Sequence, residues 1–130
     1  MELISMSQFT QAWLASYQAR TSKAHRTSRT SLTKLGTSER EADLHEEVFD
    51  ECRRRGWIAL HGSMAERTCR TLGEPDFVIL ADGGRVLFVE CKTKTGKLSP
   101  AQAALKHHAE KLGHTVHVVR SLGQFLGVAK

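Results

Sequence analysis

The longest regular pattern of apolar positions runs from residue 39 to residue 56 and predicts an amphipathic helix. Its apolar side chains fall within one arc at about 100° per residue. Acids come first, arginines come last and Gly56 follows, which suits the helix dipole and a glycine cap. The arc also holds the carboxylate of Glu41, which either complements the dipole or points toward a site. The arc comprises Glu41, Leu44, His45, Val48, Phe49 and Cys52.

Four short apolar runs predict β-strands, and two helical patterns lie among and after them. The runs are residues 57–61, 76–81, 85–91 and 115–119. Residues 99–113 predict a helix with Ser99 as N-cap, Gln102 in a capping box and Gly113 as C-cap. A last short helix is predicted over residues 121–129. This order predicts an α/β domain with a mixed β-sheet, and strands that are apolar on both sides imply helices on both faces.

The two central strands carry charged residues at one end, and the register of their hairpin decides whether these residues meet. A three-residue turn at residues 82–84 would place Asp76 opposite Glu90, with Lys92 on the same face. A two-residue turn would send the two acids to opposite faces. The three-residue turn therefore predicts three charged groups at one end of two hydrophobic strands.

Two directly opposed carboxylates destabilise a sheet unless something binds between them. A divalent cation meets this need, and hard oxygen ligands suit Mg²⁺ or Mn²⁺. The alternative is that Asp76 and Glu90 lie in solvent at the strand ends, each paired with a lysine or an arginine. The carboxylate pattern alone leaves both interpretations open.

The amino-terminal segment differs from the rest of the chain in composition. Ser7 and the spacing of Phe9, Trp13, Leu14 and Tyr17 predict a short amphipathic helix. The basic, Ser/Thr-rich residues that follow form either an arm that tracks phosphates or a solvated linker. Five cations against one acid give residues 1–38 a charge of +4, out of +5 for the chain: Arg20, Lys23, Arg26, Arg29 and Lys34 against Glu2. We therefore divide the chain into residues 1–38, a helix plus arm, and residues 39–130, the folded domain.

Length and composition exclude several classes of protein. A chain of 130 residues suits one globular domain. The sequence contains neither an apolar run long enough for a membrane span nor a signal-peptide pattern, so a soluble, cytoplasmic protein is expected. Cys52, Cys69 and Cys91 are widely spaced without a C-x-x-C pair, so we expect free thiols rather than disulfides or a zinc ribbon.

The order of the charged motifs resembles a known nuclease superfamily. Pro-Asp, a hairpin and Glu-x-Lys together resemble the PD-(D/E)XK superfamily, whose restriction-endonuclease-like core is a mixed sheet flanked by helices. More narrowly, the chain resembles the VRR-NUC family from about Glu41 to Ser121. The shared elements are Gly-x-Pro-Asp, Glu-x-Lys, Gly-Lys-Leu-Ser-Pro-x-Gln and Val-x-Val-Val-Arg-Ser.

The resemblance implies roles for individual residues. Asp76 and Glu90 would ligate Mg²⁺ or Mn²⁺ with the backbone carbonyl of Cys91, and Lys92 would orient the attacking water. The family also has a glutamate fifteen residues before a helix-ending glycine, which Glu41 and Gly56 match, so Glu41 is a further expected metal ligand. Gln102 corresponds to a glutamine near the active site, although its capping role is sufficient by itself. His45 stands where relatives often carry Gln or Glu, so the resemblance assigns it no role.

The resemblance also implies an activity. It indicates a metal-dependent endonuclease that hydrolyses DNA phosphodiester bonds, of the stand-alone phage or bacterial type. Stand-alone members look like homodimers that cut branched DNA such as four-way (Holliday) junctions. Arg67, Arg70, Lys94 and Lys97 are candidates to bind the DNA backbone, because no helix carries an obvious base-reading pattern.

Two alternatives keep other classes of protein in view. One is a basic nucleic-acid-binding module, or a nuclease subunit that needs a partner. The other is a metal-free interaction domain in which the acids form surface ion pairs. The remaining histidines show no metal-binding spacing and are expected at the surface or satisfied in place: His61, His107, His108 and His114. A role for His61 stays open, because it ends a core strand near the expected site.

Overall fold

The structure is a computed structural model that describes residues 8, 10–17, 40–61 and 71–130. The chain divides into two compact units, Met1–Leu35 and Gly36–Lys130. In the first unit the predicted helix is present over residues 10–17, where the rings of Trp13 and Tyr17 stack with centroids 5.4 Å apart. The predictions for the basic arm, and for Arg67 and Arg70, lie outside the described residues.

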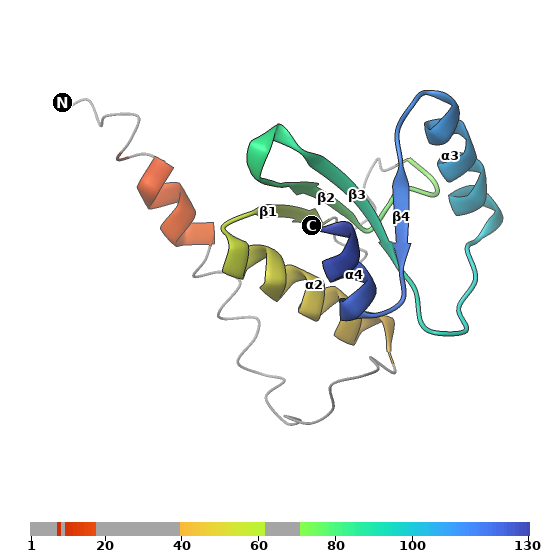
Figure 1. Cartoon of the computed structure of the whole chain (residues 1–130), viewed down its shortest axis with the longest axis horizontal. Coiled ribbons are helices and arrows are strands. Elements are labelled where there is room, and N and C mark those ends of the chain that lie inside the picture. Colours follow the sequence, from red (N-terminus) through yellow and green to blue (C-terminus); the bar gives the residue numbers. More distant parts are fainter. Residues whose placement is uncertain (1–7, 9, 18–39, 62–70) are drawn as a thin grey trace. The chain divides into compact units, whose positions relative to one another are not determined.

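The second unit is an α/β fold around one four-stranded mixed sheet, as predicted (Figure 1). The strands lie in the order β1-β2-β3-β4, with antiparallel pairs up to β3 and a parallel pair between β3 and β4. The strands are β1 (Ile58–His61), β2 (Phe77–Leu80), β3 (Val86–Cys91) and β4 (Val116–Val119). The helices are α2 (Glu41–Arg55), α3 (Pro100–Lys111) and α4 (Leu122–Val128), and a 3₁₀ turn, η1 (Asp82–Gly84), joins β2 to β3.

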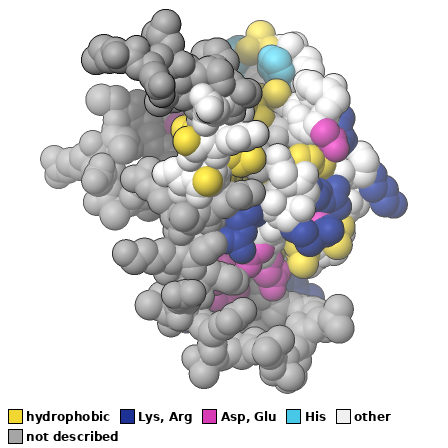
Figure 2. Space-filling model, turned by 90° about the vertical axis from the view of Figure 1, so that its left-hand side faces the viewer, with side chains coloured by type: hydrophobic (Ala, Val, Ile, Leu, Met, Phe, Trp, Pro, Cys, Tyr) yellow, Lys and Arg dark blue, Asp and Glu magenta, His cyan; other side chains and the backbone are white. Residues whose placement is uncertain are grey.

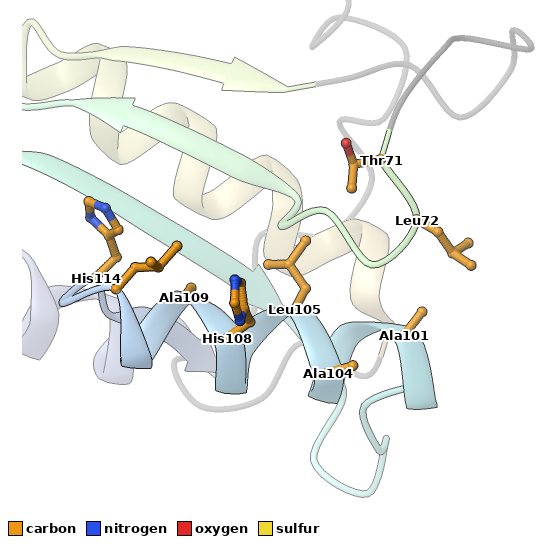
Figure 3. A pocket seen from close by; sticks show the side chains of 9 residues that line it. Thr71, Leu72, Ala101, Ala104, Leu105, His108, Ala109 and His114 are labelled. Carbon is orange, nitrogen blue, oxygen red and sulfur yellow. The ribbon is translucent and has the colours of Figure 1, made fainter.

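The core lies between the sheet and the pair α2 and α4, whereas α3 lies on the other face against β4 (Figures 1 and 3). Helices therefore lie on both faces of the sheet, as expected, although α3 leaves part of its face exposed. Leu60, Leu80 and Val86, on three neighbouring strands, are 52%, 40% and 47% exposed on the face where α3 lies. The reason is that α3, the one helix on this face among the described elements, packs at the β4 edge. The largest side chains buried in the core are Phe77, Phe125, Leu44, Ile79, Val48 and Val89.

The hairpin has the register that a three-residue turn predicts. Val78 lies opposite Phe88, and the N–H of Ala81 donates to the carbonyl of Arg85 over 2.9 Å. Gly83 and Gly84 take φ angles of 67° and 72°, which side chains other than glycine disfavour. Continued by one residue beyond β2, this register puts Asp76 opposite Glu90.

The ends of the helices follow the predicted capping chemistry with one difference. Gly56 caps α2 in the left-handed conformation, and the Ser99 and Gln102 side chains form the complete capping box of α3. At the other end of α3, however, Leu112 is the C-cap. Gly113 follows it with φ at 91°, because the left-handed turn comes one residue after the cap.

Two close contacts fix the loops at the end of the sheet where β2 begins and where β3 and β4 finish. A Cβ atom on Gly73 would lie 2.3 Å from the carbonyl oxygen of Ala101, so only glycine lets the approach to β2 pass against the first turn of α3. Across the sheet, Arg120 Nη1 donates to the carbonyls of Thr93 and Gly96 over 2.7 and 2.6 Å. The loop after β3 is thereby tied to the end of β4.

The surface carries both signs of charge. Figure 2 shows basic side chains gathered on one face with acidic side chains among them. Ion pairs of this kind occur at the end of α2, where Glu51 accepts hydrogen bonds from Arg54 and, over 2.8 Å, from Arg55. Such pairing leaves less positive charge for a phosphate backbone there.

The cysteines that the structure describes are free thiols, as expected from the sequence. Cys52 and Cys91 are buried free thiols, and burial raises the pKa of Cys52 to about 12. Cys69 lies outside the described residues. Within the described ranges, no helix has both the length and the apolar character that a membrane crossing requires.

Candidate metal centre

Three carboxylates converge at the end of the sheet where β2 begins and β3 finishes. Glu41 begins α2, Asp76 precedes β2 and Glu90 lies near the end of β3. One oxygen from each lies within 4.8 Å of the other two. The hairpin register brings Asp76 and Glu90 together, and packing of the inward stripe of α2 on the sheet adds Glu41.

Glu90 is the most enclosed of the three acids. It is 2% exposed, and its Oε1 accepts a hydrogen bond from Gln102 Nε2 over 2.6 Å. Burial, reinforced by the nearby carboxylate of Asp76, raises the pKa of Glu90 to about 7. The protein environment therefore compensates this buried negative charge incompletely.

Asp76 has a different environment, although it is opposed to Glu90. Its Oδ2 accepts the backbone N–H of Cys91 over 2.8 Å and lies 3.2 Å from His45 Nε2. Burial opposes ionisation, but His45 and the Cys91 N–H outweigh it and lower the pKa of Asp76. Asp76 is thus held as a carboxylate.

Lys92 supplies a cation beside the acids. Its side chain is 12% exposed, and Nζ lies 3.4 Å from Glu90 Oε1 and 4.0 Å from Glu41 Oε2. The sequence placed Lys92 on the same side as the two strand acids, and the structure puts it within reach of Glu90 and Glu41. An ammonium held in this way keeps a fixed orientation toward whatever occupies the cluster.

Gln102 lies both in the capping box of α3 and beside Glu90 of the cluster. Its Oε1 accepts the backbone N–H of Ser99 over 2.9 Å, which completes the capping box, and its Nε2 donates to Glu90. The two groups of one side-chain amide therefore link the start of α3 to the cluster. Mutating Gln102 would disturb a helix end and a carboxylate at once.

The donor set fits a hard divalent cation. Three carboxylates from three elements supply oxygen ligands, and one of them is a buried acid that gains from a nearby positive charge. Lys92 alone is a poor substitute, since an ammonium bears one charge and pairs with two of the acids. The predicted contribution of the Cys91 carbonyl stays a prediction, and the buried position of Cys91 is compatible with it.

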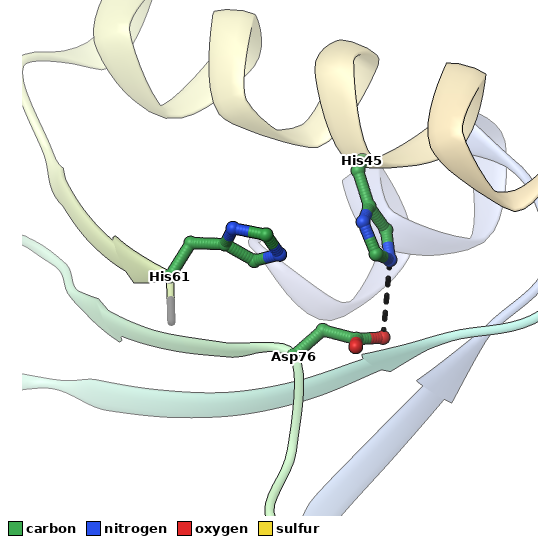
Figure 4. A group of neighbouring side chains, drawn as sticks. All are labelled: His45, His61 and Asp76. Atoms are coloured by element: carbon green, nitrogen blue, oxygen red, sulfur yellow. Dashed lines mark ion pairs between the residues drawn. The ribbon is translucent and has the colours of Figure 1, made fainter. Parts of the chain in front are cut away.

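His45 is the residue that sequence reasoning missed. Its ring lies between α2 and Asp76, and the Asp76 carboxylate beside it raises the pKa of His45. The ring of His61 lies next to it, with centroids 5.1 Å apart (Figure 4). The available signal was position, because His45 lies four residues after Glu41 on the same inward stripe.

The candidate DNA-binding residues are only partly described. Lys94 and Lys97 are exposed on the loop between β3 and α3, which Arg120 holds. The structure does not test their predicted role.

An apolar groove follows α3 on the outer face of the sheet (Figure 3). Its volume is about 480 Å³, and Leu72, Leu105 and Leu112 are among its lining residues. The groove lines no part of the carboxylate cluster, and its apolar walls are unsuited to a phosphate.

Comparison with known proteins agrees with this architecture. The family model of the VRR-NUC domain matches residues 12–122. The match therefore begins well before Glu41, where the resemblance seen in the sequence begins. A solved structure described as a VRR-NUC domain superposes with a TM-score of 0.56 at 24% identity, covering 72% of this chain and 95% of that chain. No curated protein matches the chain. The match over most of its length shows that the chain belongs to the VRR-NUC domain family, a nuclease-type family.

Proposed function

We propose that this protein is a Mg²⁺- or Mn²⁺-dependent endodeoxyribonuclease. The observation that carries the proposal is the position of Lys92, whose ammonium lies beside Glu90 and Glu41 in a cluster completed by Asp76. A purely structural ion pair would require one acid for one lysine. Lys92 lies beside two of the three acids and carries a single charge, so the cluster keeps negative charge for a divalent cation and, through it, for a phosphodiester.

Each side chain has a proposed task. Asp76, Glu90 and Glu41 hold the cation, which when bound acidifies a water and offsets charge on the phosphate. Lys92 orients the attacking water and stabilises negative charge as it develops. Gln102 fixes the carboxylate of Glu90 through its 2.6 Å hydrogen bond. Lys94 and Lys97, together with Arg67 and Arg70, hold the DNA backbone and select no base.

We further propose that the enzyme acts on branched DNA as a homodimer, because paired active sites can nick two strands of one junction. The small size of the chain and the family resemblance support this. The exposed apolar side chains of Leu60, Leu80 and Val86 offer a surface on which a second copy could pack. A monomeric mass in light scattering at micromolar concentration would contradict the homodimer.

Cleavage of a labelled substrate panel tests the activity. The panel contains single-stranded, duplex, flap and four-way junction DNA, each with Mg²⁺ or Mn²⁺ and with a chelator as blank. Wild type is compared with Lys92→Ala and with Lys111→Ala, a matched loss of an exposed lysine near the end of α3. We expect Lys92→Ala to slow cleavage by about 10²-fold to 10³-fold while binding persists.

The outcomes separate the candidate functions. Cleavage by wild type and Lys111→Ala, with binding but little cleavage by Lys92→Ala, supports a nuclease whose substrate the panel identifies. Binding without cleavage by all three proteins would refute autonomous catalysis and favour a nucleic-acid-binding subunit. An unaltered rate for Lys92→Ala would show that the cluster is not the catalytic site.

A further inference from the structure

Two histidines and an aspartate face one another beside the carboxylate cluster. His45 comes from α2, His61 ends β1 and Asp76 precedes β2 (Figure 4). One ligand atom from each residue lies within 4.8 Å of the other two. Because three separate elements supply them, their convergence is a property of the fold and not of a local motif.

The buried ring nitrogen of His45 lies in an ion pair with Asp76 but makes no hydrogen bond within the described residues. His45 Nε2 is shielded from solvent and lies 3.2 Å from Asp76 Oδ2, yet among the described residues it makes no hydrogen bond of acceptable geometry. A cation between the ring and the carboxylate would satisfy both.

Aromatic packing holds the two rings in place. The His61 ring centroid lies 4.7 Å from that of Phe77, and the His45 centroid lies 5.5 Å from it. The two imidazoles meet edge to face. Nitrogen ligands whose rings are oriented by packing are preorganised for a metal, and the exposure of His61 leaves a path for an ion.

The donor set differs in kind from that of the neighbouring cluster. Imidazole nitrogens favour first-row transition ions such as Co²⁺, Ni²⁺ and Zn²⁺, whereas oxygen-only sets suit Mg²⁺ and Mn²⁺. We infer that His45, His61 and Asp76 form a second, nitrogen-rich site for a first-row transition-metal dication. Asp76 belongs to both groups, so its carboxylate bridges a harder site and a softer one.

This inference goes beyond the proposed nuclease activity, because the site needs only these three side chains. The test titrates Co²⁺ into the metal-free full-length protein and follows visible d–d absorption, with no nucleic acid present. Glu90→Gln weakens the oxygen site and keeps the nitrogen site. His61→Ala removes one nitrogen ligand, and His114→Ala removes a comparably exposed histidine outside the group.

We expect one saturable imidazole-type absorption in wild type, Glu90→Gln and His114→Ala, and excess Mg²⁺ should not remove it. His61→Ala should weaken Co²⁺ binding by at least about tenfold, since even an outer-shell change costs that much at metal sites. His61→Gln is a second variant, and thermal unfolding without metal checks that both variants fold like wild type.

The inference is overturned if wild type shows no saturable absorption, or if both His61 variants bind Co²⁺ as tightly as His114→Ala. Displacement of Co²⁺ from Glu90→Gln by equimolar Mg²⁺ would also overturn it. Failure of the nuclease proposal gives a different result. A chain that binds Co²⁺ through His61 but cuts none of the DNA panel refutes the activity and leaves this site standing.

Discussion

Asp76 and Glu90 occupy opposed positions on one hairpin, but Asp76 turns toward α2 and Glu90 toward α3. On the α2 side, an imidazole and a backbone N–H hold Asp76 as a carboxylate and lower its pKa. On the α3 side, Glu90 meets the Gln102 amide in a nearly closed environment, and its pKa rises to about 7. Two acids at opposed positions of one hairpin can therefore have pKa values shifted in opposite directions, because the helix that covers each acid decides how its charge is compensated.

The largest effect should come from forcing the two sides apart. Gly73→Ala would place a Cβ atom 2.3 Å from the Ala101 carbonyl oxygen at a φ of 85°, so the segment before Asp76 and the start of α3 must separate. We expect a loss of about 3 kcal/mol or more in the free energy of unfolding, measured in urea. Gly83→Ala is the control, with a φ of 67° and no atom within 4 Å. Equal losses for both variants would show that backbone strain alone matters.

Neutralising each acid in turn should give stability changes of opposite sign. In chelator-treated protein, Asp76→Asn loses a charge-assisted contact with the Cys91 N–H and should destabilise by about 1–3 kcal/mol. Glu90→Gln removes a poorly compensated buried charge, so it should be neutral or stabilise by about 1 kcal/mol. Thermal and urea unfolding measure both. Comparable destabilisation by the two variants would remove the distinction between the two sides.

Substituting Gln102 tests whether this residue matters only as the cap of α3 or also as the hydrogen-bond partner of Glu90. Gln102→Ala should lower stability by about 1 kcal/mol as a lost cap and slow cleavage by about 10-fold to 100-fold as a lost carboxylate partner. Gln124→Ala removes a similar interaction at the start of α4, where Oε1 accepts over 2.7 Å the N–H of Arg120, the residue before the N-cap Ser121. It should match the stability loss and leave cleavage near wild type. An equal effect of both variants on cleavage would limit Gln102 to a structural role.

The smallest effect concerns how the far end of α2 is held. Hydrogen bonds from Arg54 and Arg55 lower the pKa of Glu51 to about 2 from an ordinary 4.5. This carboxylate stabilises the fold above pH 4.5, and the contribution declines as pH falls toward 2. Glu51→Gln should therefore cost about 0.5 kcal/mol at pH 7. Urea unfolding from pH 7 to pH 3 should show the two proteins converging, and a constant gap would assign the loss to packing.

Much of the fold was predictable because its signals are local. The glycines at 83 and 84 set the turn, the turn set the register, and the register placed Asp76 opposite Glu90. Ser99 and Gln102 marked the start of α3 through capping chemistry alone. Each of these features follows from a turn or a helix cap whose residues are a few positions apart.

The features that were not predicted depend on contacts between residues far apart in the sequence. Which parts of the outer sheet face stay exposed depends on where α3 packs, and no local pattern encodes that position. The meeting of His45, His61 and Asp76 requires α2, β1 and β2 to be assembled, so neither histidine showed metal-ligand spacing in the sequence. Long-range packing, not side-chain chemistry, hid these features.

The hairpin register also bears on the order of folding. Asp76 and Glu90 are joined by a short turn between strands, and hairpins form within about 1–10 μs. His45 and Gln102 arrive from helices whose contacts with the sheet close longer loops and form later. The two acids therefore meet before the side chains that offset their charge. A divalent cation in the folding buffer should accelerate refolding of wild type and have no such effect on Glu90→Gln.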